Sequence, residues 1–251
     1  MKFNWRPFKK ILKYTGIATG SIIIILFLLP LLFPGTIKEK IKEWANSSIK
    51  GELNFSNVRL SFFNHFPSLT LTLYNFSLKG SAPFQKDTLV AGKELALGVN
   101  LSSLFGKAIT IDEIYLTNGK LNVLTDATGH PNYNVYVSDT TVKQTTDTSS
   151  SASLKLARIQ IDNCSLNYDD RSIPFVLKAG RVDYLGKGDL SESVFDLGSN
   201  IKMEKAWLNF NNQQYLENKR LAADLVTKIN TSSLSLVFER NKLKINRLPL
   251  E

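Results

Sequence analysis

Two histidines and one cysteine are the side chains of this chain whose types could support nucleophilic or metal chemistry. His65 lies among aromatic residues, and His130 lies in a loop sequence next to Gly129 and a proline. Neither has a second His or a Cys at ligand spacing. Cys164 has no partner for an intrachain disulfide, and its apolar strand context predicts a packing role. We therefore predict no metal site, no cofactor and no nucleophilic centre.

Acidic pairs are the other candidates for chemistry, because two close carboxylates can share acid and base roles. Asp112–Glu113 and Asp169–Asp170 are such pairs. Neighbours on a strand point to opposite faces of the sheet, so neither pair forms a carboxylate dyad. The sequence also lacks a phosphate-binding glycine loop, a G-x-S-x-G turn and a dinucleotide fingerprint. We predict that the protein is not an enzyme. An enzymatic function is the least favoured of three interpretations.

The net charge of +9 is concentrated at one end of the 251-residue chain. Residues 1–50 hold nine Lys/Arg and two Glu, a net charge of +7, whereas the other 201 residues hold 22 Lys/Arg and 20 Asp/Glu. With 43% apolar and 21% charged residues, the bulk has an ordinary globular composition. We therefore predict one or two folded domains and no nucleic-acid partner.

An uncharged run near the N-terminus has the length of a transmembrane helix. Twenty residues from Tyr14 give about 30 Å of helix, enough to span a bilayer. Five basic residues and no acidic residue precede the run, which predicts a cytoplasmic N-terminus. We predict a basic tail over 1–14, a transmembrane helix over 15–33 and a juxtamembrane amphipathic helix over 34–50. The apolar residues expected in the anchor are Ile17, Ile22, Ile23, Ile24, Ile25, Leu26, Phe27, Leu28, Leu29, Leu31, Leu32 and Phe33.

Other interpretations of this N-terminal segment remain open. A cleaved signal peptide would have the same basic start, but no A-x-A-like site directly follows the run, and Ala45-Asn46-Ser47 is only a weak candidate. The basic flank disfavours a buried core helix. The segment 34–50 could equally cap the domain that follows it.

From residue 52 onward the apolar residues recur with a period of two, which predicts half-buried antiparallel strands. Leucines alternate with polar residues over 69–73 and 95–101. The isoleucines over 109–116 do the same, with one phase slip. The segment 215–229 fits either a helix or a strand. Similar alternation occurs near 155–169, 173–185, 205–216 and 233–247. The Ser/Thr-rich segment 138–153 predicts a flexible loop.

An eight-residue pattern recurs along the chain: apolar, any, apolar, any, Asn, any, any, apolar. The apolar phase changes across the asparagine, so each strand must bulge or turn there. Asparagine tolerates the left-handed backbone that such a break needs. We therefore predict a structural role for these asparagines. They are Asn57, Asn75, Asn118, Asn163 and Asn212.

These patterns predict a mainly β protein, with a transmembrane helix followed by an antiparallel repeated-strand groove over 51–251. The groove would be a curled sheet, and a β-sandwich is the alternative that closes the same apolar face. Core packing and an apolar ligand surface would use the same residues. The candidates for the inward face are Leu69, Leu71, Leu73, Leu95, Leu97, Val99, Ile109 and Ile111.

The order of these segments resembles the N-terminal region of the AsmA family, particularly its long Bacteroidetes-type members. After a basic start and one anchor, the segments that carry the resemblance are 51–60, 63–71, 75–78, 101–106, 109–111, 126–129 with Asn132, and 241–250. The resemblance covers essentially the whole chain, and its motifs are diffuse. Since the chain stops within a strand pattern, we expect it to be truncated at its C-terminus.

The resemblance implies a single-pass inner-membrane protein with a cytoplasmic N-terminus and its bulk in the periplasm. The family is similar to bridge-like lipid-transfer proteins, whose repeated β units form a hydrophobic groove. It implies a role in outer-membrane biogenesis, with phospholipid as the expected partner and acyl chains held in the groove. The second interpretation is an anchored adaptor or structural protein that affects outer-membrane protein assembly through contacts with other envelope proteins.

Overall fold

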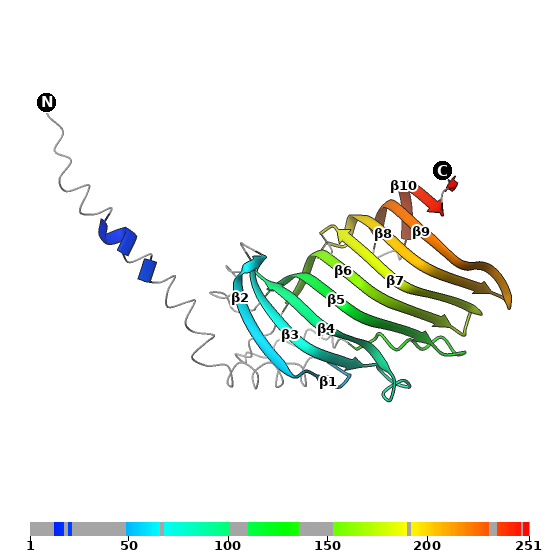
Figure 1. Cartoon of the computed structure of the whole chain (residues 1–251), viewed down its shortest axis with the longest axis horizontal. Helices are drawn as coiled ribbons and strands as arrows, with labels where there is room; N and C mark the ends of the chain where they lie inside the picture. Colours follow the sequence, from blue (N-terminus) through cyan, green and yellow to red (C-terminus); the bar gives the residue numbers. More distant parts are fainter. Residues whose placement is uncertain are drawn as a thin grey trace, which may run out of the picture.

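The computed structural model describes most of the chain after residue 48 (Figure 1). Its described ranges are 13–17, 20–21, 49–65, 68–100, 110–135, 153–189, 192–230, 235–246 and 248–250. Residues 13–17 and 20–21 are helical. No helix within the described ranges is long and apolar enough to cross a membrane. The predicted anchor residues other than Ile17 lie outside the described residues. Residues 34–48 of the predicted amphipathic helix lie outside them as well.

The period-two segments form the strands of one sheet. Their bounds are β1 Leu53–Asn54, β2 Asn57–His65, β3 Ser68–Lys79, β4 Thr88–Val99, β5 Thr110–Thr125, β6 Ser153–Asp170, β7 Phe175–Lys187, β8 Val194–Phe210, β9 Gln213–Asn230, β10 Ser235–Ile245 and β11 Leu248–Leu250. The segment that fitted either a helix or a strand is β9. The chain is mainly β, as its alternation predicts.

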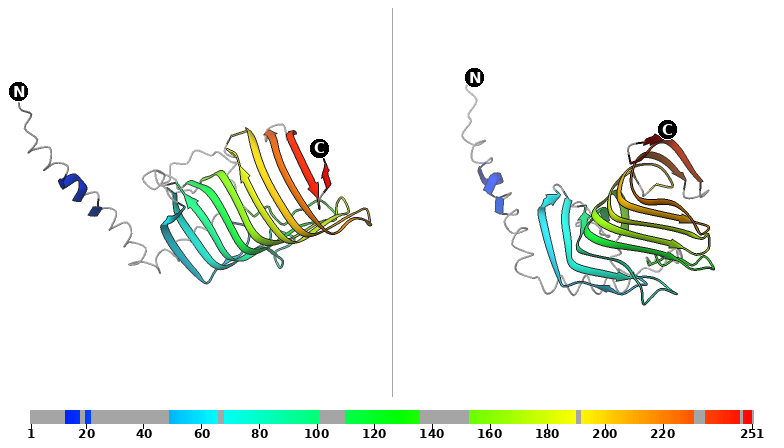
Figure 2. Two further views of the ribbon diagram at one scale, coloured as in Figure 1. Left: turned by 45° about the horizontal axis from the view of Figure 1, so that its top comes forward. Right: turned by 45° about the vertical axis from the view of Figure 1, so that its right-hand side comes forward.

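The strands lie nearly in chain order, from β1 and β3 at one edge to β10 and β11 at the other, while β2 also pairs with β3. The sheet is open and curved, and its strands follow one another along a trough (Figures 1 and 2). Within the described residues it is a single sheet, so the curled-sheet prediction describes it better than the sandwich alternative.

One strand pair departs from the antiparallel prediction. β5 and β6 run parallel, with Ile114 opposite Ile159 and Leu121 opposite Leu166, whereas all other described pairs are antiparallel. A parallel pair needs a crossover connection of a dozen residues or more, whereas a hairpin needs two. The chain between Thr125 and Ser153 has that length. The predicted flexible loop 138–153 lies outside the described residues except for Ser153, which begins β6, and the sequence did not indicate the direction of that strand.

The phase slip predicted between Ile111 and Ile114 is a β-bulge. In the β4–β5 pairing, Gly98 lies opposite Glu113, but the next residue, Val99, lies opposite Ile111. Asp112 is therefore the extra residue. The bulge keeps Ile111 and Ile114 on one face of the sheet although their spacing is odd.

The asparagine prediction is confirmed at four of its five positions. Asn75, Asn118 and Asn163 have φ of 47°, 52° and 52° inside strands, and Asn212 has φ of 63° in the turn between β8 and β9. Asn57 was predicted wrongly, since its φ is not positive. It begins β2, and its Oδ1 accepts a hydrogen bond from the Val58 amide at 2.8 Å, so no break is needed there.

The left-handed residues keep the apolar side chains of each strand on one face. Leu116 and Leu121 are five residues apart, a spacing that would place them on opposite faces of a regular strand. Asn118 lies between them, and both leucines pack into the same cluster. Lys205 with φ of 53° and Asn218 with φ of 51° make the same break in β8 and β9. The buried members of the cluster are Phe55, Val58, Leu73, Phe76, Leu116 and Cys164.

Candidate functional site: the apolar face of the sheet

The structure brings the predicted inward residues together on one face. Cross-strand partners share a face, and here the pairs are Leu69 with Val99, Leu71 with Leu97, Leu73 with Leu95, and Val99 with Ile111. Ile109 lies outside the described residues. Seven of the eight candidates therefore form one continuous apolar surface over β3, β4 and β5.

Much of this surface is closed by protein at the β3 end. Leu69, Leu73, Val99 and Ile111 are only 1–7% exposed, whereas Leu71, Leu95 and Leu97 are half-buried. The opposite face is buried there too, because Thr70 and Thr72 are 0% and 4% exposed. The three half-buried leucines are therefore the members of the predicted set that a ligand could contact.

The same face continues far beyond the predicted residues. From Leu95 a row of partners crosses Leu116, Ile161, Tyr184, Ile201, Ala223 and Leu243, ending on β10. From Tyr184 onward every member of this row is half-buried. Leu225 adds an apolar side chain beside the row on β9. The sequence candidates omitted these positions, although the alternation in 194–203 and 221–229 is the signal that marks them.

The opposite face of the later strands is mainly polar, although Ala222 and Val226 also lie on it. Lys202, Asp224, Lys242 and Lys244 alternate with the apolar residues and are exposed. The ion pair between Lys228 Nζ and Glu239 Oε1, at 3.1 Å, belongs to this end of the sheet. The substantial contacts between described strands all join neighbours in the one sheet. The later part of the sheet is therefore amphipathic, with one apolar and one water-facing surface.

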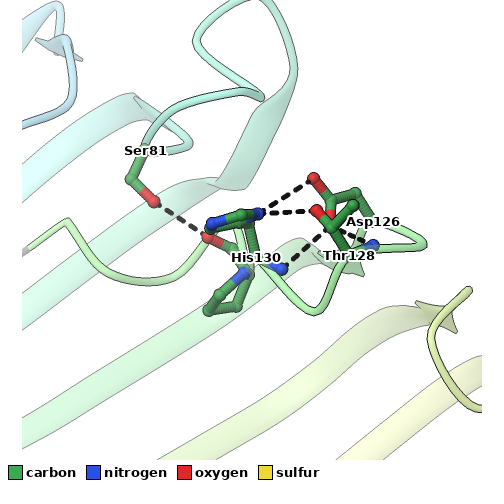
Figure 3. Close-up of polar contacts among 5 residues, drawn as sticks. Ser81, Asp126, Thr128 and His130 are labelled. Carbon is green, nitrogen blue, oxygen red and sulfur yellow. Dashed lines mark hydrogen bonds and ion pairs between the residues drawn. The ribbon is translucent and has the colours of Figure 1, made fainter.

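A compact polar cluster closes the loop after β5 (Figure 3). Asp126 Oδ1 accepts hydrogen bonds from the Thr128 amide, the Thr128 hydroxyl and the His130 amide at 2.7–2.9 Å. The Thr128 hydroxyl bond, followed by the His130 amide bond, lowers the pKa of Asp126 to about 2. These bonds span only five residues, so they fix the turn.

This cluster contains the residue types of a catalytic triad but not its geometry. A relay needs the two ring nitrogens of histidine to contact different partners. His130 approaches both Thr128 Oγ1, at 2.7 Å, and Asp126 Oδ2, at 3.4 Å, through the single atom Nδ1. The turn is held to the sheet by Asn132, which is fully buried and accepts from the Leu124 amide at 3.0 Å. The arrangement therefore positions a loop.

The structure also shows the surroundings of the other residues whose types could support chemistry. Cys164 is fully buried, and its Sγ accepts a hydrogen bond from the Gly119 amide at 3.2 Å. Burial raises the pKa of this thiol. Burial likewise raises the pKa of Asp112, with a contribution from the charge of Glu113. His65 is the last residue of β2. In the described part of the chain, no three His, Cys, Asp or Glu residues form a group that could hold a metal ion.

Comparison with known protein families matches residues 8–228 to one family, described as the AsmA family. The match begins before the predicted anchor and extends into β9, so it includes most of the apolar face. Comparisons with curated proteins and with solved structures gave no match.

Proposed function

The chain belongs to the AsmA family, and membership in this family suggests a function in the cell envelope, so we propose that the chain binds phospholipid. The acyl chains lie along the apolar face of the open sheet, and the polar face remains in water. Binding is passive, by exclusion of apolar surface from water. The predicted N-terminal helix anchors the protein in the inner membrane, with its bulk in the periplasm.

The observation that carries this proposal is the continuity of the half-buried row from Ile161 to Leu243 on the apolar face. Neighbouring strands are about 4.8 Å apart, so an acyl chain laid across four strands covers about 14 Å. One leaflet of a bilayer core is about 15 Å thick, which is a comparable length. At about 0.8 kcal/mol per buried methylene, such a contact would hold a lipid chain.

Photo-crosslinking of the full chain tests which face is used. The probe is a phospholipid with a photoactivatable group at the end of one acyl chain, supplied in vesicles. We expect crosslinked peptides to map to the apolar face, at positions such as Ile201 and Leu225. Adducts concentrated on the opposite face, at positions such as Lys202 and Asp224, would contradict the proposal.

A second candidate function follows from the exposed edge of β10. Leu236, Val237 and Phe238 are 54–61% exposed, and among the described strands β11 pairs only with the far end of β10, at 243–245. An apolar edge of this kind can accept an extended segment of another protein. This is the adaptor interpretation, in which the protein assists outer-membrane protein assembly.

Two variants separate the candidates in cells. Leu225→Asp changes the apolar face, and Val237→Lys changes the exposed edge on the opposite face, where Val237 lies opposite Lys228. Lipid binding predicts that only the first alters the lipid content of the envelope. The adaptor function predicts that only the second lowers the amount of outer-membrane proteins, so the two readouts are opposite.

A further inference from the structure

Two turns that are distant in sequence meet at one end of the trough. The β6–β7 turn and the β8–β9 turn are joined by a hydrogen bond from the Asn211 amide to the Pro174 carbonyl at 2.9 Å. The strands beside them pair directly, with Phe175 opposite Phe210. These turns form part of the rim along the right-hand end of the sheet in Figure 1.

A hollow of about 510 Å³ lies at this rim. Asp169 and Arg171 line it from the first turn, and Asn209, Asn212 and Gln214 line it from the second. This volume is within the usual range for small-molecule sites. The three amide side chains are exposed, so they are available to a ligand.

The charges of the hollow are mixed in sign. Arg171 Nε lies 3.3 Å from Asp169 Oδ2, and the arginine side chain is 61% exposed. Asp170 also lines the hollow, but its Oδ1 already accepts the Ser172 hydroxyl at 2.6 Å and the Ser172 amide at 3.0 Å. Two carboxylates and one guanidinium give a formal charge of −1. A purely anionic ligand is therefore disfavoured, and one that carries both signs is favoured.

The hollow lies where the opposite face of the sheet meets the rim, and it reaches the apolar face through Phe175. The lining residues that are cross-strand partners on that opposite face are Asp169, Val176, Asn209 and Gln214. Phe175 lines the hollow and makes edge contacts with Tyr168 and Phe210, at centroid distances of 5.7 and 6.5 Å. Tyr168 belongs to the row of partners that begins at Val123 and continues to Leu177 and Leu208. An amphiphile could therefore cross the rim, with its apolar part on these rings and its polar part in the hollow.

We infer that this hollow binds the headgroup of a zwitterionic phospholipid that carries a primary ammonium, with Asp169 facing the ammonium and Arg171 the phosphodiester. The inference rests on the proposed function, since the acyl chains occupy the apolar face. The three amides donate to the remaining phosphate oxygens. The site thus selects among lipids by their headgroups, whereas the apolar face accepts any acyl chain.

The test compares two lipids on the full-length chain. The protein is equilibrated with vesicles of equal parts dioleoyl phosphatidylethanolamine and dioleoyl phosphatidylglycerol, then re-isolated, and the bound lipid is quantified by mass spectrometry. We expect about three- to fivefold enrichment of the ethanolamine lipid, the range of a favourable exposed ion pair. Asp169→Asn and Arg171→Gln each bring the ratio back toward one without lowering the total bound lipid.

Arg181→Gln is the matched control, because Arg181 and Asp183 form a similar pair two residues apart on β7, at 3.4 Å, away from the rim. Its ratio should equal that of the wild type. If lipid is bound but the ratio is the same in every variant, the headgroup site is wrong and the proposed function stands. If no chain binds lipid, the proposed function fails. Binding of soluble phosphoethanolamine without bound lipid would overturn the assignment of a lipid ligand.

Discussion

The side chain of Asn163 donates a hydrogen bond from Nδ2 to Asn118 Oδ1 at 2.6 Å, across the parallel pair of β5 and β6. Both residues have left-handed backbones with φ of 52°. The bond therefore joins two strands at the level where each reverses its side-chain alternation. Cys164 fills the same region, because its Sγ accepts the Gly119 amide. This junction aligns the apolar halves of the two strands.

Asn118→Ala should destabilise the protein by about 2–3 kcal/mol, because alanine is unfavourable at positive φ and the bond to Asn163 is lost. Asn118→Gly restores the backbone freedom and should cost only about 1 kcal/mol. Urea unfolding followed by circular dichroism measures the difference. Asn57→Ala is the control, since Asn57 fills the same sequence pattern without a positive φ and loses only its bond to the Val58 amide, which should cost about 1 kcal/mol or less. Equal effects at both positions would contradict this account.

Leu73→Ala should cost about 2–5 kcal/mol of unfolding free energy, because Leu73 is 1% exposed in the core cluster and the change leaves a cavity. Leu248→Ala removes the same atoms at a residue that is 70% exposed. That variant should stay within about 0.5 kcal/mol of the wild type in the same measurement. A small effect at Leu73 would mean that β3 is not part of a packed core.

Cys164 should react with maleimide on the order of a hundredfold more slowly in the folded chain than in denaturant, because the thiol is reached only by opening of the sheet. Its raised pKa also lowers the thiolate fraction at neutral pH. Mass spectrometry follows the labelling. In a Cys164→Ala background, Ala127→Cys places a thiol at an exposed turn residue and should react at once. Rapid labelling of native Cys164 would exclude the described packing of β5 against β6.

Asp126 should stabilise the fold at neutral pH and lose this effect in acid. Its pKa is about 2 in the folded chain and 3.8 for the ordinary group, so the folded state favours the carboxylate. The stabilisation is fully present above about pH 4 and is lost as the pH falls through about 2. Melting temperatures of the wild type and Asp126→Asn should therefore differ at pH 7 and converge toward pH 2. Parallel curves over this range would show that the loop bonds do not depend on the charge.

Local patterns predicted the strands and their breaks because both are properties of a single segment. The period of two marks β3, β4 and β5, and the odd spacing across Asn118 requires a break within one strand. The same rule failed at Asn57, because β1 ends at Asn54 and β2 begins at Asn57, so the change of phase falls between two strands. Lys205 was missed because lysine is not a residue type typical of left-handed backbone.

Features that depend on how strands pair with one another could not be predicted from single segments. Nothing local to residues 110–125 or 153–170 indicates that these strands run parallel, since the direction depends on the path of the connection between them. The extension of the apolar face to Ile201 and Leu225 depends on the register of β8 against β9. The rim hollow joins Asp169 to Asn209, forty residues apart, through two strand pairings.

Phospholipid binding on the apolar face is tested most directly by the amount of phospholipid that the re-isolated full chain retains, counted per protein molecule by mass spectrometry. Leu225→Asp and Val226→Asp are a matched pair, because the residues are adjacent on β9, both half-buried, and lie on opposite faces. We expect at least one phospholipid per wild-type chain, retained by Val226→Asp and lost by Leu225→Asp while both variants stay folded. A folded wild-type chain without phospholipid, or equal retention by the two variants, would contradict this expectation.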